Sequence, residues 1–260
     1  STSSGNSPFN GASALKSIVV PEGVTEIPEN MFTYAQSLVS IKLPSTLEKI
    51  GGYAFNGCSG LTNIVIPEGI KRIPNYAFDD CTGLTNVSLP DGLTEIGYFA
   101  FAGCTSLQSI NLPDSITGLD ASIFSGCTKL TSVNYPLNIT KKLSSTFSGN
   151  SPFNGALALK SIVVPEGVTE IPNSMFTYAQ SLTNVQLPNT LKVIGYYSFQ
   201  YCSGLTQISI PKGTESLSDG AFYNCNNLVA IEIPATVISI GKDAFYDCTD
   251  LTIYGYSGSY

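Results

Sequence analysis

Prolines recur every 23 residues along almost the whole chain, and this spacing restricts the possible folds more than any other feature. They stand at Pro21, Pro44, Pro67, Pro90, Pro113 and Pro136, and then, after one step of 29, at Pro165, Pro188, Pro211 and Pro234. A period of about 20 to 50 residues is the signature of a solenoid, in which each unit stacks on the one before it. We therefore expect a stack of similar coils.

Apolar residues occupy the same positions in each unit. In the unit from Leu61 to Gly83 they are Leu61, Ile64, Ile66, Ile70, Ile73, Ala77, Phe78 and Cys81. The alternation of Ile64 and Ile66 with other residues is typical of a strand with one buried face. Pro67 ends this strand because proline has no amide to donate. Near the end of the unit, Phe78 and Cys81 follow Ala77 by one and four residues, and this spacing favours a single helical turn.

These patterns predict an α/β solenoid. We expect a right-handed superhelix with a parallel β-sheet on one face and short helical turns on the other, because one unit alone cannot bury its apolar face. Eleven phenylalanines mark about eleven coils. They are Phe9, Phe32, Phe55, Phe78, Phe101, Phe124, Phe153, Phe176, Phe199, Phe222 and Phe245.

A longer repeat lies above the 23-residue one. Residues 15–28 recur as residues 159–172, a shift of 144, and residues 4–12 recur as 148–156. We interpret residues 1–260 as one duplicated solenoid domain, with a first array at 1–137, a seam at 138–153 and a second array at 154–260. The seam carries six extra residues, for which we expect a bulging loop. Two separate solenoids are the alternative.

The seven cysteines all stand three residues after the repeat phenylalanine. They are Cys58, Cys81, Cys104, Cys127, Cys202, Cys225 and Cys248. Alanine replaces cysteine in the first units of both arrays, which indicates a small buried side chain and hence a column of free thiols. Disulfides between adjacent coils are the alternative, although the odd number and the parallel direction of stacked side chains disfavour them.

Catalytic and metal-binding patterns are missing from the sequence. It has no histidine and no C-x-x-C pair, so we expect no enzyme activity and no cofactor or metal. A row of carboxylates follows the repeat prolines: Glu22, Glu68, Asp91, Asp114 and Glu166. The row is either a stripe for a cation or basic ligand or a solvated edge. Tyrosines next to the repeat phenylalanines indicate either an interface or half-buried packing.

The net charge is −7, with only 12 Lys and Arg residues and no basic cluster. This balance disfavours binding to nucleic acid or to an anionic membrane surface. No apolar run approaches the length of a membrane-spanning helix, so we expect no membrane insertion of this segment.

The exposed positions of the repeat strands form the candidate binding surface. They are polar, nearly uncharged and rich in Ser, Asn and Gln, which suits many weak hydrogen bonds to a partner. The predicted residues are Lys42, Asn63, Asn86, Ser88, Asn111, Asn134, Asn184, Gln186, Gln207 and Glu232. The alternative is that an exposed sheet simply tolerates short polar residues there.

The repeat resembles the BspA-like leucine-rich repeats of bacterial surface proteins, which share the pattern L-x-x-I-x-I-P-x-x-[IVL]-x-x-I-x-x-x-A-F-x-x-C-x-x. The resemblance implies an extracellular or cell-surface protein whose signal peptide and anchor lie outside this chain. It also implies adhesion to a host matrix protein, a glycan or other cells. A structural stalk or scaffold domain without a ligand of its own is the alternative. The repeat motif fixes neither the ligand-contacting residues nor the oligomeric state.

Overall fold

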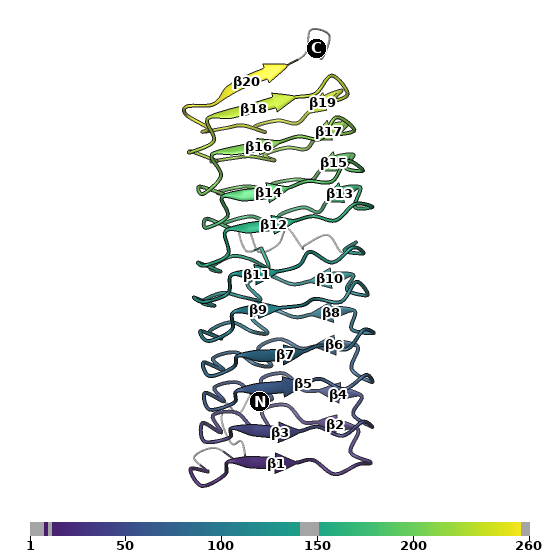
Figure 1. Cartoon of the computed structure of the whole chain (residues 1–260), viewed down its shortest axis with the longest axis vertical. Helices are drawn as coiled ribbons and strands as arrows, with labels where there is room; N and C mark the ends of the chain where they lie inside the picture. The colour runs from purple at the N-terminus through teal and green to yellow at the C-terminus, as the bar shows by residue number, and fades with distance from the viewer. Residues whose placement is uncertain (1–7, 10–11, 141–150, 256–260) are drawn as a thin grey trace.

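The computed structural model describes residues 8–9, 12–140 and 151–255. The chain winds into one elongated solenoid whose coils stack along the long axis of the molecule (Figure 1). The described residues complete about ten turns. This number is one below the count of phenylalanines, because Phe9 precedes the first strand and belongs to an incomplete leading turn.

Each coil begins with a short strand, and these first strands lie parallel to one another in a column; the last of them, β20, begins a coil that the described residues do not complete. They are β1 (Ser17–Val19), β3 (Ser40–Lys42), β5 (Asn63–Val65), β7 (Asn86–Ser88), β9 (Ser109–Ile110), β11 (Ser132–Val133), β12 (Ser161–Val163), β14 (Asn184–Gln186), β16 (Gln207–Ser209), β18 (Ala230–Ile233) and β20 (Thr252–Gly255). Ile18 pairs with Ile41, and Ile64 with Val87, so equivalent positions of adjacent repeats overlie one another. The predicted strand and its single inward face are confirmed.

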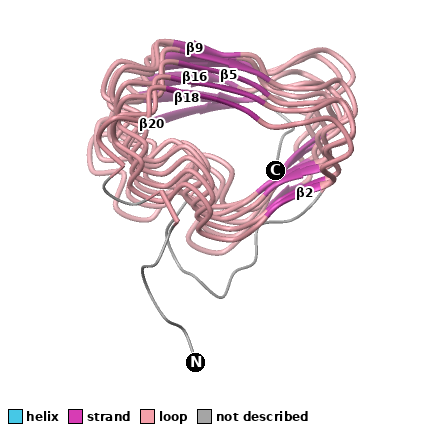
Figure 2. Ribbon diagram, turned by 90° about the horizontal axis from the view of Figure 1, so that it is seen from below, coloured by secondary structure: helices cyan, strands magenta, loops and turns pink. Residues whose placement is uncertain are grey.

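A second column of two-residue strands lies on another side of the coils, as the view along the axis shows (Figure 2). Its members are β2 (Glu26–Ile27), β4 (Lys49–Ile50), β6 (Arg72–Ile73), β8 (Glu95–Ile96), β10 (Gly118–Leu119), β13 (Glu170–Ile171), β15 (Val193–Ile194), β17 (Ser216–Leu217) and β19 (Ser239–Ile240). The sequence indicated only an irregular or extended segment here. The outward residues form ion pairs between coils, as in Lys49 to Glu26 at 2.7 Å.

The predicted helical turns are absent: residues 8–9, 12–140 and 151–255 contain no helix. The segment 74–81 forms linked turns instead. The Phe78 amide donates to the Ala100 carbonyl of the next coil at 2.9 Å rather than to its own segment. Tyr76 (φ 58°) and Asp80 (φ 56°) adopt left-handed backbone conformations. An α-helix would use these amides internally, whereas here they hold neighbouring coils together, so the prediction of a helix was wrong.

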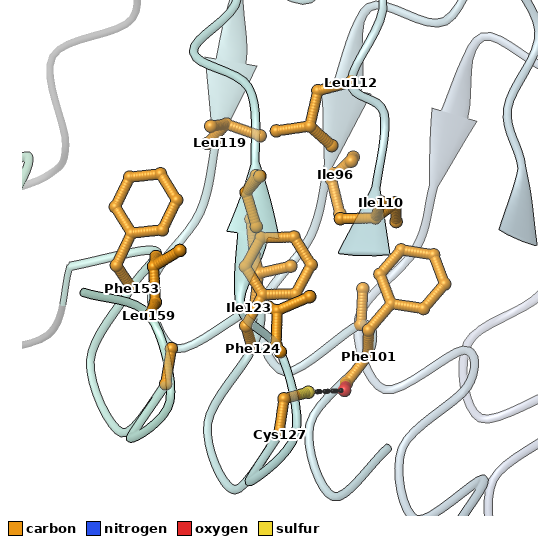
Figure 3. Close-up of a cluster of buried hydrophobic side chains, with 14 of the residues drawn as sticks. Ile96, Phe101, Ile110, Leu112, Leu119, Ile123, Phe124, Cys127, Phe153 and Leu159 are labelled. Carbon is orange, nitrogen blue, oxygen red and sulfur yellow. Dashed lines mark hydrogen bonds between the residues drawn. The ribbon is translucent and has the colours of Figure 1, made fainter. Parts of the chain in front are cut away.

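The core is a stack of phenylalanine rings that runs along the solenoid. Consecutive rings lie with centroids 5.0 Å (Phe9 to Phe32) to 6.3 Å (Phe101 to Phe124) apart. Figure 3 shows Phe101, Phe124 and Phe153 inside the coils, with Ile and Leu side chains of the strands above them. Because each ring between Phe32 and Phe222 contacts a ring on either side, none of these coils can bury its phenylalanine without its neighbours.

The cysteines are free, and all but the half-buried Cys248 are buried, which confirms the predicted thiol column. Each thiol donates to the carbonyl oxygen of the phenylalanine 26 residues earlier, as in Cys127 to Phe101 at 3.1 Å (Figure 3). Burial raises the pKa of the Cys58 and Cys127 thiols to about 12. Each of these carbonyl oxygens also accepts a backbone amide, as Phe101 does from Cys104 at 3.3 Å, so the thiol adds a second bond, between coils, that alanine lacks.

Stacking continues across the seam. The Ser122 amide donates to the Ser151 carbonyl at 2.8 Å, and the Gly126 amide to the Gly155 carbonyl at 3.1 Å, each over 29 residues. Residues from both arrays belong to one hydrophobic cluster. The expected bulging loop falls largely on residues 141–150, which lie outside the described residues. The division into two arrays stays an interpretation of the sequence.

Candidate functional site

The outward surface of the first-strand column, here called the strand face, carries all ten predicted binding residues, and every one of them is exposed. Alternation along each strand places the inward Ile or Val in the core and its two neighbours in solvent. The ten residues extend from β3 to β18 and do not form a single site. Their intramolecular contacts separate them into groups.

In the first array, Asn63 and Asn86 bond to each other. The Asn86 side-chain amide donates to the Asn63 side-chain oxygen at 2.8 Å and to the Thr85 hydroxyl at 3.1 Å. The Asn63 amide donates to the Thr62 hydroxyl at 2.9 Å. These amides thus connect β5 to β7, and much of their hydrogen-bonding capacity is already used. Ser88 is exposed beside them.

Asn134 fastens two coils together. Its side-chain oxygen accepts from the Leu112 amide at 2.7 Å, and its side-chain amide donates to the Leu112 carbonyl at 2.7 Å. In other coils a backbone carbonyl takes this place, as in the bond from Ile66 to Ser88 at 2.9 Å. The Asn134 side chain therefore replaces a missing ladder bond next to the short strands β9 and β11, and it is not free for a ligand.

Asn184, Gln186, Gln207 and Glu232 meet around one open groove of about 590 Å³. We call this surface the amide groove; its other outward side chains include Asn189, Ser209, Pro211 and Tyr254. None of the four predicted side chains makes a hydrogen bond or ion pair within the described part of the chain. The groove therefore presents amide donors, amide acceptors and one carboxylate directly to solvent.

Tyr254 is the residue of the amide groove that periodicity missed. In the pairing of β18 with β20, Tyr254 lies beside Glu232. The two residues are 22 positions apart in the sequence, one fewer than the 23-residue repeat. The fixed period would have pointed to Gly255. Its side chain is 58% exposed. The signal that could have found it is the strand pattern of the last unit, Leu251-Thr252-Ile253-Tyr254, aligned by its inward isoleucine rather than by residue count.

The strand face of the first array has a different character. Lys42 lies in a groove of about 540 Å³ whose lining includes Glu22, Glu68 and the exposed Val65. A smaller hollow of about 350 Å³ holds Asn111 together with the occupied Asn134. Around Lys42 the groove is thus lined by aliphatic side chains and carboxylates. The amides of Asn63, Asn86 and Asn134 are engaged in hydrogen bonds.

Three of the five carboxylates that follow the prolines, Glu22, Asp114 and Glu166, hold adjacent coils together. Glu22 accepts hydrogen bonds from the amide and hydroxyl of Ser45 at 3.1 and 3.0 Å. Glu166 accepts from the Asn189 backbone amide at 3.0 Å, and Asp114 accepts from the Leu137 backbone amide at 3.1 Å. In both cases the donor lies 23 residues, or one coil, further along the chain. The bonds from Ser45 and Asn189 lower the pKa of Glu22 and of Glu166. No cluster of metal-ligating side chains is found among the described residues.

Tyrosines form ladders over the turn segments. Tyr53 stacks on Tyr76 with ring centroids 4.7 Å apart, and Tyr178 on Tyr201 at 4.5 Å. Each of these four rings is covered on at least one face by its neighbour, while Tyr53 stays 37% exposed. These contacts favour the packing interpretation of the tyrosines over the interface interpretation.

Comparison with known proteins places the repeat in a family. The family model described as a BspA type leucine rich repeat region (6 copies) matches residues 2–82, 49–152 and 149–257. Among curated proteins no relative is found. No helix in the described residues has the length and apolar character needed to cross a membrane.

Solved structures of bacterial proteins share the fold. A leucine-rich repeat protein from Bacteroides ovatus is 29% identical with a TM-score of 0.53, over 94% of this chain and 74% of that one. A leucine rich cell surface protein from Faecalibacterium prausnitzii is 26% identical with a TM-score of 0.50, over 96% of this chain and 75% of that one. A leucine-rich repeat protein of T. pallidum is 26% identical with a TM-score of 0.51, over 74% and 78%.

Proposed function

Because this chain belongs to the BspA type leucine-rich-repeat family, we propose that it is a bacterial cell-surface or secreted interaction module that binds a protein or a glycan through the amide groove of its strand face. The observation that carries the proposal is the amide groove, where four polar side chains converge without hydrogen-bond partners among the described residues. The cell-surface protein of Faecalibacterium prausnitzii supports the location.

The other faces of the solenoid offer less to a ligand. The second-strand column uses its charges in pairs between coils, as in Lys192 to Glu215 at 2.9 Å. The tyrosines cover one another, and Glu22 and Glu166 fasten adjacent coils. A volume of about 590 Å³ falls within the range of about 300–1,000 Å³ typical of ligand sites.

Binding rather than catalysis suits this groove. Glu232 is the only carboxylate among the lining residues. A glycosidase needs a pair of carboxyl groups about 5–10 Å apart, and the sequence has no histidine to act as a base. We therefore propose a ligand-binding role without an enzyme activity.

The test is a binding screen of the purified chain against extracellular matrix proteins and glycans. The groove variant changes Gln207 and Glu232 to Ala. The matched control changes Asn63 and Ser88 to Ala, 144 residues earlier on the same face. We expect wild type and control to bind a common ligand and the groove variant to bind at least tenfold more weakly. Equal binding by all three proteins would contradict a role for the groove.

A structural stalk is the second candidate, and the continuous phenylalanine stack favours it because a stack of this kind makes a stiff rod. A stalk needs no ligand of its own. If wild type binds nothing in the screen, the stalk is the better description.

A further inference from the structure

The duplication of the chain lets two strand faces be compared position by position. Asn184, Gln186 and Gln207 of the second array correspond to Ser40, Lys42 and Asn63 of the first, each 144 residues earlier. Both arrays use parallel strands in the same register. The backbone is therefore alike, but the second array places Asn184, Gln186 and Gln207 around one groove, whereas the first-array Asn63 bonds to Asn86.

Amide side chains match the chemistry of sugar hydroxyls. A carboxamide carries two donors and an acceptor in one plane, so it can bond two adjacent hydroxyl groups at once, one as donor and one as acceptor. Asn184, Gln186 and Gln207 offer this arrangement, and Glu232 adds a pure acceptor. None of these groups is used within the described part of the chain.

A peptide strand fits this surface less well. Peptides that extend a sheet bond to the backbone of a free edge strand. Here β16 and β18 already pair with each other from Gln207 and Ala230 to Ser209 and Glu232, so their backbone groups are used in the ladder. An edge strand of this sheet is β20, at the end of the groove where Tyr254 lies. A ligand seated over β16 and β18 therefore meets mainly side chains, which favours a compound with many hydroxyl groups.

Tyr254 provides the apolar element of the groove. Its ring is 58% exposed and makes no ring contact within the described residues, unlike the stacked Tyr178 and Tyr201. An exposed aromatic ring with a polar tip can pack against the C–H face of a pyranose while its hydroxyl bonds at the rim.

The charge of the groove distinguishes between classes of sugar. Glu232 is the only charged residue among those lining it, and no Lys or Arg is present there. A sialylated or sulfated sugar would place like charges together, which is unfavourable. We infer that the amide groove is a lectin-like site for a neutral oligosaccharide; this inference rests on the proposed function and specifies its ligand.

Calorimetry and saturation-transfer NMR with defined sugars test the inference. The neutral probes are mannotriose, N-acetyllactosamine and maltotetraose, and the anionic probes are sialyllactose and a heparin tetrasaccharide. We expect at least one neutral probe to bind with a Kd of about 1 mM or tighter, and both anionic probes to bind more weakly. Failure of all three neutral probes, or binding of anionic probes alone, would overturn the inference.

Matched variants locate the binding. Asn184→Ala with Gln207→Ala, and separately Tyr254→Ala, are expected to weaken the neutral sugar at least tenfold. The control pair Ser40→Ala with Asn63→Ala is expected to stay within twofold of wild type. Thermal melts by circular dichroism check that all variants are folded. Unchanged sugar binding in both groove variants would also refute the assignment.

A glycoprotein arm separates this inference from the broader proposal. A matrix protein that binds through the groove is tested again after enzymatic removal of its glycans. Loss of binding supports the neutral-sugar site. Retained binding means that a protein surface is the ligand, so the proposed function holds and the sugar inference fails. If neither sugars nor proteins bind, both fail.

Discussion

Removal of a phenylalanine from the middle of the stack is the most direct test of how the solenoid is held together. Phe78 is fully buried, and its ring lies 5.1 Å from that of Phe55 and 5.4 Å from that of Phe101. Phe245 is only partly buried and, among the described residues, stacks on Phe222 alone, at 5.6 Å. The pair Phe78→Ala and Phe245→Ala therefore compares a ring that has two neighbours with a ring that has one.

The expected costs differ by about 3 kcal/mol. A buried Phe→Ala change typically costs about 3–5 kcal/mol, and stacked ring pairs add about 0.5–1.5 kcal/mol each beyond burial. With two such pairs and no access for water, Phe78→Ala should lie near the upper limit, at about 5 kcal/mol. Phe245→Ala loses one pair and leaves a site that solvent can fill, so about 2 kcal/mol is expected.

Urea denaturation followed by circular dichroism measures these costs. With an m-value of about 3 kcal/mol/M, the midpoint should fall by about 1.7 M for Phe78→Ala and by about 0.7 M for Phe245→Ala. Stacked repeats depart from two-state unfolding, so native-state hydrogen exchange should show whether protection is lost locally around the altered coil. Equal midpoint shifts for the two variants would refute the argument that neighbouring coils supply the core.

Three further outcomes are expected from the same structure. Asn134→Ala removes both 2.7 Å bonds to the neighbouring coil and should cost about 1–3 kcal/mol in urea denaturation, whereas Asn111→Ala on the same surface should cost less than about 0.5 kcal/mol. In a thiol-labelling assay of the folded protein at pH 8, the half-buried Cys248 should react first. The thiolate is the reactive form, and full burial raises the pKa of thiols such as Cys81 well above the ordinary value. Reaction of Cys81 before Cys248 would contradict this. Burial also raises the pKa of Asp79 to about 6, above its value in the unfolded chain. Ionisation of Asp79 therefore destabilises the fold as pH rises through this range. Asp79→Asn should be more stable than wild type at pH 8, with the gain lost below about pH 4; a stability gain that does not change with pH would contradict this.

The amino-acid sequence alone determined the solenoid, its buried columns and its exposed strand face. These features follow from identity of residue type at a fixed spacing: Ile64, Phe78 and Cys81 recur in register, and residues of one kind at one position of every coil must share one environment. The same reasoning led to the free thiols, because Cys and Ala exchange at a single position. The family also followed from this repeat.

Only the tertiary structure decided which polar groups are used to hold the coils together. The Phe78 amide bonds to the next coil, so the turn segment is not helical, although the spacing of its apolar residues fits a helix equally well. Asn134 and Gln207 both occupy exposed strand positions, yet Asn134 clamps Leu112 and Gln207 has no partner in the described residues. The physical reason is that periodicity defines which face a side chain occupies, whereas a hydrogen bond depends on distances of about 3 Å between coils. Those distances exist only once the coils are stacked.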